Sequence, residues 1–146
     1  MAMTNNSQIA ISGLVATTPR HITTLDGLPI TSFRLASGVK VWDKTTSNWK
    51  DGETNWFTIT AFYNLAINIK DSVSKGDRVI VYGSLKVRDW DNGERSGTSV
   101  EITADTIGHD LAWGTSVFTR TAFTSSSQDY DNDPNNEKVD LTTDTE

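Results

Sequence analysis

The chain has 146 residues, of which 36% are hydrophobic, and a formal net charge of −6. That length suits one folded domain, and the low apolar content predicts that part of the chain stays unfolded. The absence of cysteine excludes disulfides and thiolate metal sites, and no apolar run is long enough for a signal sequence or a membrane span, so we expect a cytoplasmic protein.

The negative charge is concentrated at the C-terminal end. The chain has 13 basic and 19 acidic residues, and one basic and seven acidic residues lie in residues 128–146. This leaves 12 basic and 12 acidic residues in residues 1–127. The net charge of the whole chain therefore does not argue against nucleic-acid binding by the N-terminal part.

Five segments with apolar residues at every second position predict five strands. These segments are residues 9–15, 33–41, 57–61, 79–87 and 100–104. Five short strands in about a hundred residues favour a small β-barrel or sandwich.

Two glycines interrupt these strand patterns. Gly13 and Gly83 mark bulges or sharp bends that closure of a barrel requires, or else they are tolerated glycines with no special role.

One helix is predicted between the third and fourth strands, over residues 64–72. Asn64 can cap it, the apolar residues that follow recur at helical spacing, and Gly76 can end it with a positive φ. Three strands, one helix and two strands is the order of the OB-fold. We therefore expect an all-β, five-stranded OB-fold barrel with one helix.

Polar segments connect and follow these elements. A loop is expected over 43–55, a turn over 91–97 and a loop over 105–114. A weakly alternating stretch, 115–124, is a candidate extra strand, and residues 125–146 are predicted to be a disordered acidic tail.

Strand alternation places most of the tryptophans outside the core. Trp56 and Phe62 alternate with the predicted core residues of the third strand, and Trp90 opposes the valines of the fourth. Trp42 opposes Val39 and Val41, which are assigned to the core face, and Trp49 lies in the predicted loop. Exposed rings of this size imply a binding partner.

Several cations lie near these rings. They are Lys40, Lys44, Lys50, Lys86 and Arg88. Bases of a single strand can stack on exposed rings while cations follow the phosphates, so the pattern favours single-stranded nucleic acid. The alternatives are that the rings cover the core from outside or form a protein–protein interface. Trp113 has no basic neighbour in the sequence and is assigned a structural or subunit-contact role.

Catalysis finds little support in the sequence, so we expect no enzyme activity, metal or cofactor. His21 and His109 are isolated and are interpreted as loop or surface residues. Asp129, Asp131 and Asp133 loosely match a calcium loop, but proline follows where that loop requires glycine.

Ordered motifs between Ile9 and Trp113 resemble those of the bacterial single-stranded DNA-binding protein family. They are Gly13, Pro19, Phe33-Arg34-Leu35-Ala36, Trp42 with Trp56, Phe62, Asn64-Leu65-Ala66, Lys75 to Gly83, Leu85 to Trp90, and Ile107-Gly108. The resemblance implies a homotetramer of OB-folds that binds single-stranded DNA in replication, recombination and repair. The domain organisation it implies is a DNA-binding domain over 1–114, a possible clamp strand over 115–124 and an acidic tail over 125–146.

The resemblance also implies roles for individual residues. Base-stacking positions fall on Trp42, Trp56, Phe62 and Trp90, and positions that contact the DNA backbone fall on Lys75, Lys86 and Arg88. Asp89 stands where many relatives have a basic residue, which implies a lower affinity for DNA at that point.

The C-terminal part resembles the family less closely. Trp113-Gly114 and the stretch after it are most similar to actinobacterial members, in which an extra strand clamps subunits together. Family tails usually end in a Pro-Phe tip that docks on replication and repair proteins, whereas this sequence ends in Asp140 to Glu146. This favours a specialised version, such as a paralogue or a plasmid or phage member, and leaves recruitment through the tail open.

Two other functions compete with single-strand binding. An OB-fold protein–protein module, such as a replication accessory subunit, would use the same aromatic face on a protein partner. An OB-fold nuclease would need a cluster of metal-binding acids with arginines on the barrel, and the sequence contains no such cluster.

Overall fold

The structure is a computed structural model that describes residues 7–122. The chain divides into two units, Met1–Ser116 and Val117–Glu146, and the fold below is that of the described part of the first. No strand is assigned in residues 115–122. The predicted tail and the end of the candidate clamp strand lie outside the described residues.

Residues 7–122 form six strands, and all of them except the short second strand close into the predicted five-stranded barrel. The strands are β1 Ser7–Val15, β2 Arg20–Thr23, β3 Pro29–Asp43, β4 Asn48–Phe62, β5 Arg78–Asp91 and β6 Ser96–His109. They pair in the order β1-β5-β6-β4-β3-β2, and a further pairing of β1 with β3 closes the ring. The pairings are antiparallel except that of β4 with β6, which is parallel. The short strand β2, which pairs only with β3, was not predicted because its four residues show no alternation.

The core fills the barrel with the residues that the alternation selected. Its fully buried members include Val15, Leu35, Ile59, Val81 and Ile102. Because neighbouring side chains on a strand point to opposite faces, burial of these residues turns Trp56, Lys86 and their same-face neighbours outward.

The helix α1, Tyr63–Ser72, lies between β4 and β5, as predicted. It begins one residue before the expected start, so Phe62 rather than Asn64 takes the N-cap position. Ala66 and Ile69 bury its inner face against the barrel. Gly76 has the expected positive φ, +96°, but it does not end the helix: Val73 already takes an extended conformation as the C-cap, and Gly76 instead shapes the loop before β5.

A buried hydroxyl ties α1 to the barrel. Thr31 is 1% exposed, and its hydroxyl donates to the Ala66 carbonyl oxygen at 2.7 Å. The Thr31 Oγ1 also lies 2.7 Å from His21 Nδ1, and because its proton is already committed to Ala66, the histidine must donate from Nδ1. His21 thus links β2 to β3, a structural role.

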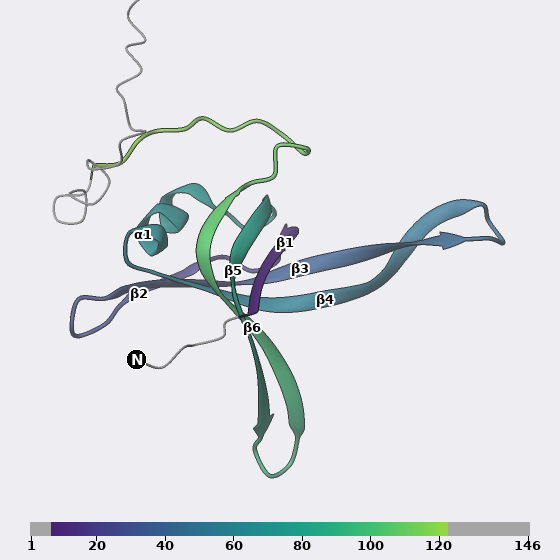
Figure 1. The fold of residues 1–146 in the computed structure, drawn as a ribbon, viewed down its shortest axis with the longest axis horizontal. Helices are drawn as coiled ribbons and strands as arrows, with labels where there is room; N and C mark the ends of the chain where they lie inside the picture. Colours follow the sequence, from purple (N-terminus) through teal and green to yellow (C-terminus); the bar gives the residue numbers. More distant parts are fainter. Residues whose placement is uncertain (1–6, 123–146) are drawn as a thin grey trace, which may run out of the picture. The chain divides into compact units, whose positions relative to one another are not determined.

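Two hairpins extend beyond the barrel as arms (Figure 1). One is the outer part of β3 and β4, joined by residues 44–47, and the other is the outer part of β5 and β6, joined by residues 92–95. The expected loop over 43–55 is therefore wrong, because β4 already begins at Asn48. The polar residues 48–55 pair with β3 along an arm that is exposed on both faces, so they show no apolar alternation.

The arms also explain which predicted core residues are exposed. Val39, Val41 and Val87 are 48%, 44% and 59% exposed. They continue the alternation of the barrel strands, but no second layer formed by residues 7–122 covers the arms, so their assignment to the core is wrong. At the other end, β6 continues to His109 and occupies part of the predicted loop 105–114.

Gly13 and Gly83 lie where strands approach too closely for a side chain. A Cβ on Gly13 would lie 2.6 Å from the Ala36 carbonyl oxygen. A Cβ on Gly83 would meet the backbone of Thr103 and Ala104, and the β5–β6 register shifts between Tyr82 and Gly83. The bend expected at Gly83 is confirmed by this irregularity.

No helix in the part of the chain that the structure describes is long and apolar enough to cross a membrane.

Candidate nucleic-acid interface

Four indole rings lie exposed on the barrel and its arms. Trp42, Trp49, Trp56 and Trp90 are 46%, 66%, 49% and 44% exposed. Trp56 lies on a barrel strand whose other face packs in the core. Trp42, Trp49 and Trp90 lie on the arms. Rings held on paired strands are positioned at little conformational cost, which suits stacking on a flat ligand.

Trp56 lies on the barrel beside an arginine from β3. The Arg34 Cζ is 5.6 Å from the centroid of the Trp56 ring, within reach of a cation–π interaction. Arg34 Nη1 also donates to the Thr58 hydroxyl at 2.8 Å. The register pairs Arg34 with Thr58 and Ala36 with Trp56, so the guanidinium reaches diagonally across the two strands.

Trp42 and Trp49 face each other across the β3–β4 arm. They are register partners, and their rings meet edge to face with centroids 5.4 Å apart and planes at 70°. The contact stabilises the arm and presents two rings in a fixed relation. Lys40, also on this arm, donates from Nζ to the carboxylate of its register partner Asp51.

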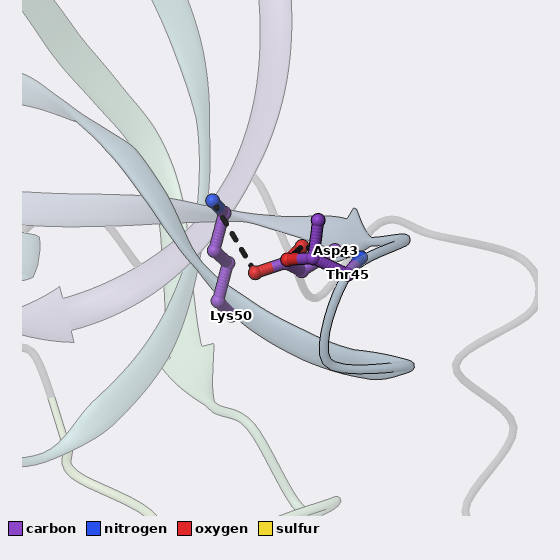
Figure 2. Close-up of polar contacts among 3 residues, drawn as sticks. All are labelled: Asp43, Thr45 and Lys50. Atoms are coloured by element: carbon purple, nitrogen blue, oxygen red, sulfur yellow. Dashed lines mark hydrogen bonds and ion pairs between the residues drawn. The ribbon is translucent and has the colours of Figure 1, made fainter.

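The tip of the same arm is organised by Asp43 (Figure 2). Its carboxylate accepts from the hydroxyl and the backbone N–H of Thr45, at 2.6 and 2.9 Å, and lies 3.7 Å from Lys50 Nζ. The Thr45 hydroxyl and then its N–H hold the pKa of Asp43 below its ordinary value of 3.8. The hydrogen bond from Lys40, followed by its charge, lowers the pKa of Asp51 in the same direction.

Trp90 lies near the end of the β5–β6 arm, opposite Gly97. A Cβ at Gly97 would lie 2.8 Å from the indole, so the glycine leaves room for the ring to lie across β6. Trp90 and Gly97, together with neighbouring residues of both strands, line a shallow open pocket. Asp89 accepts a hydrogen bond from the Thr98 hydroxyl at 2.9 Å on this arm.

Lys86 and Arg88 lie on the outward face of β5, across from an acid of β6. Glu101 is the register partner of Lys86, and its Oε2 lies 3.6 Å from Arg88 Nη2. On its other side Glu101 pairs with Thr58 in β4. β4, which carries Trp56, and β5, which carries Trp90, therefore lie on the two sides of β6 at Glu101.

The other predicted site residues lie further from this face. Lys44 is exposed in the turn of the β3–β4 arm. Phe62, half-buried, shares the outward face of β4 with Trp56 but lies six residues away, about 20 Å along an extended strand. Lys75 lies in the loop before β5, at the opposite end of that strand from Lys86 and Arg88.

Trp113 has a basic neighbour that its sequence position did not predict. The Arg78 Cζ lies 4.4 Å from the centroid of the Trp113 ring, and Trp113 is 66% exposed. The first residue of β5 thus anchors the segment that follows β6. This contact is structural, and the assignment of Trp113 to subunit contact stays a prediction.

Two contributors to the interface were missed in the sequence. Arg34 alternates with Phe33 and Leu35, so its outward direction could have been predicted, but its contact with Trp56 depends on the β3–β4 register. Gly97 was interpreted only as part of a turn. Its place under Trp90 depends on the β5–β6 register, which no local pattern reveals.

His109, like His21, has structural partners. His109 Nε2 lies 3.1 Å from the Ser72 carbonyl oxygen and 3.5 Å from Asp77 Oδ2, which joins the end of β6 to the loop after α1. Within residues 7–122, no group of three or more His, Cys, Asp or Glu side chains is arranged to hold a metal ion.

Comparisons with known proteins agree with this architecture. The Single-strand binding protein family matches residues 6–110. The Single-stranded DNA-binding protein 2 of Tropheryma whipplei is 50% identical over 114 residues, which cover 78% of this chain and 75% of that protein. The Single-stranded DNA-binding protein 1 of Streptomyces coelicolor is 46% identical over 123 residues, 84% of this chain and 78% of that protein.

A solved structure has the same fold. The crystal structure of a small single-stranded DNA-binding protein from Streptomyces coelicolor superimposes with a TM-score of 0.69 at 44% identity, over 76% of this chain and 100% of that chain. The matched family region contains the barrel and both arms. The OB-fold assignment is thus confirmed, and the chain belongs to the single-strand binding protein family.

Proposed function

We propose that this protein binds single-stranded DNA with little sequence preference, by stacking bases on exposed indoles and contacting phosphates with lysine and arginine. The observation that carries the proposal is the exposure of four indoles on paired strands, with Arg34 packed against one of them; the indoles are those of Trp42, Trp49, Trp56 and Trp90. Every base has a flat face, so stacking tolerates any sequence and contributes about 1–3 kcal/mol per base. The printed names of its relatives describe the same kind of ligand.

A titration with dT oligomers tests the proposal. Bases that stack on the indoles should quench tryptophan emission at low salt, and unquenched emission together with no change in oligomer anisotropy would contradict it. The logarithm of the binding constant should fall with the logarithm of salt concentration, with a slope of about −0.7 per neutralised phosphate. A duplex of the same length should bind more weakly, because its bases are not free to stack on the rings.

We also propose that the protein works as a homotetramer. β1 pairs with β5 along Ser7–Leu14 but meets β3 only at Leu14 and Val15, so among the described strands its outer edge is open over most of its length. An open strand edge can pair with the same strand of another copy. Ile80 and Tyr82, both more than 40% exposed on β5 beside it, provide apolar surface for such a contact.

The mass in solution tests the assembly. Without DNA we expect about four times the chain mass of 16.1 kDa. With a dT oligomer the mass should rise only by that of the bound oligomer. A mass near that of one chain at micromolar concentration would contradict the tetramer without affecting the binding proposal. Residues 115–124 are proposed to add a clamp strand to a neighbouring subunit, so their removal should shift the assembly towards smaller species.

We further propose that the protein binds single-stranded DNA in replication, recombination and repair and does not cleave it. These processes expose single strands in the cytoplasm of bacteria. A labelled single strand incubated with the protein and Mg²⁺ or Ca²⁺ should stay intact, whereas cleavage would favour the nuclease alternative. Capture of a specific protein partner after nuclease treatment, without dT binding, would favour the protein–protein module.

A further inference from the structure

The strongest unexplained feature of the interface is an acid in the middle of its basic face. Glu101 lies on the outward face of β6, beside Thr58 of β4 and opposite Lys86 of β5, and its side chain is 35% exposed. Its Oε2 lies 3.6 Å from Nη2 of Arg88, whose side chain is 56% exposed. Glu101 is therefore the cross-strand partner of Lys86 and the ion-pair partner of Arg88.

We infer that Glu101 limits the affinity of this face for DNA by occupying the place of a phosphate beside Arg88 and across the strands from Lys86. The inference rests on the proposed function, since it concerns the same interface. A phosphate that contacts Arg88 must either displace the carboxylate or lie beside it and be repelled. Because β6 is paired with β4 on one side and β5 on the other, the backbone of Glu101 is held in place, and its negative charge stays near the two cations when DNA arrives.

The β3–β4 arm shows the same arrangement. Lys40 pairs with Asp51, and Lys50 lies 3.7 Å from Asp43, so cations of this arm also have carboxylates within the chain. With 12 basic and 12 acidic side chains, residues 1–127 carry no excess of positive charge. Stacking on the indoles must then supply a large part of the binding free energy, and the acids set how much the phosphates add. Glu101 is the most consequential of these acids because it lies next to two cations.

The test is Glu101→Gln, which keeps the shape of the side chain and removes its charge. We expect the variant to bind a dT oligomer about 3- to 5-fold more tightly than the wild type at about 0.1 M salt, the size of effect that an exposed ion pair allows. One more neutralised phosphate should steepen the salt dependence by about 0.7 in slope, so the gain should shrink as salt rises. Equal or weaker binding with an unchanged slope would overturn the inference.

Asp26→Asn provides the matched control. Asp26 is exposed in the turn between β2 and β3, and its substitution makes the same change in net charge away from Glu101. Because salt screens exposed charges beyond about 10 Å at 0.1 M, this variant should bind within about twofold of the wild type. An equal gain in both variants would show an effect of net charge alone and would also overturn the inference.

Two further measurements separate this role from a structural one. Loss of the cross-strand pair should leave the thermal midpoint of Glu101→Gln equal to or slightly below that of the wild type, so tighter binding cannot come from a more stable fold. In an Arg88→Gln background, the gain from Glu101→Gln should fall to less than half on a logarithmic scale, and an undiminished gain would contradict the pairing with Arg88. If the wild type itself fails to bind dT, the proposed function fails; if it binds and Glu101→Gln does not bind more tightly, only this inference fails.

Discussion

The guanidinium of Arg34 lies 5.6 Å from the ring of Trp56 and is held there by a hydrogen bond to the Thr58 hydroxyl. The three side chains come from two paired strands, so the register of β3 and β4 sets their geometry. Arg34 therefore packs against the indole and holds a cation beside the ring on which we propose that a base stacks.

Replacement of Arg34 by lysine should weaken binding although the charge is kept. An ammonium cannot stack as a plane on the indole while donating to Thr58, so we expect a loss of about 0.5–1 kcal/mol, or roughly two- to fivefold in affinity for dT oligomers. Titrations at constant salt would measure it. An unchanged affinity would show that Arg34 contributes only its charge.

Trp56→Ala and Trp90→Ala should each remove one stacking surface. We expect each to lose about 1–3 kcal/mol of binding free energy, measured by anisotropy of a labelled dT oligomer because the tryptophan signal itself changes. Leu25→Ala is the matched control, since Leu25 is fully exposed in the turn between β2 and β3 and lies outside the interface. Full affinity in both tryptophan variants would favour the protein–protein interpretation of the aromatic face.

Gly83→Ala should destabilise the fold, whereas Gly108→Ala should not. A Cβ at position 83 would collide with the backbone of Thr103 and Ala104, which cannot move as a side-chain end could, and such overpacking costs about 1–3 kcal/mol. At Gly108, on the strand that pairs with β5, a Cβ would meet nothing within 4 Å. Urea unfolding of both variants measures the difference in the free energy of unfolding, and equal stability would contradict the close approach.

The arm that carries Trp42 and Trp49 should loosen only in acid. Asp43 and Asp51 have pKa values below 3.8, so each stabilises the folded arm above its unfolded pKa and loses this contribution as the pH falls through its lower, folded pKa. The circular dichroism of the coupled indoles should thus be constant from about pH 8 to about pH 5 and should weaken below pH 3.8. In Asp43→Asn with Asp51→Asn the acid transition should diminish, and an unaltered transition would assign it to other groups.

The sequence by itself determined the closed barrel, the helix between β4 and β5 and the outward direction of Trp56, Lys86 and Trp90. Each follows from a local pattern, because a strand with one buried face must alternate and a helix must repeat every three to four residues. The same local patterns failed at Val39, Val41 and Val87, where alternation continues into arms that have no core to cover.

Only the tertiary structure decided which outward residues meet. Arg34 reaches Trp56, Gly97 leaves room for Trp90, and Glu101 lies opposite Lys86 and beside Arg88 because of the pairing between strands. A shift of one residue in any of these pairings would turn every side chain of that strand to the other face. The core specifies the register, and the register brings these polar and aromatic side chains together, so no stretch of sequence taken alone contains the interface.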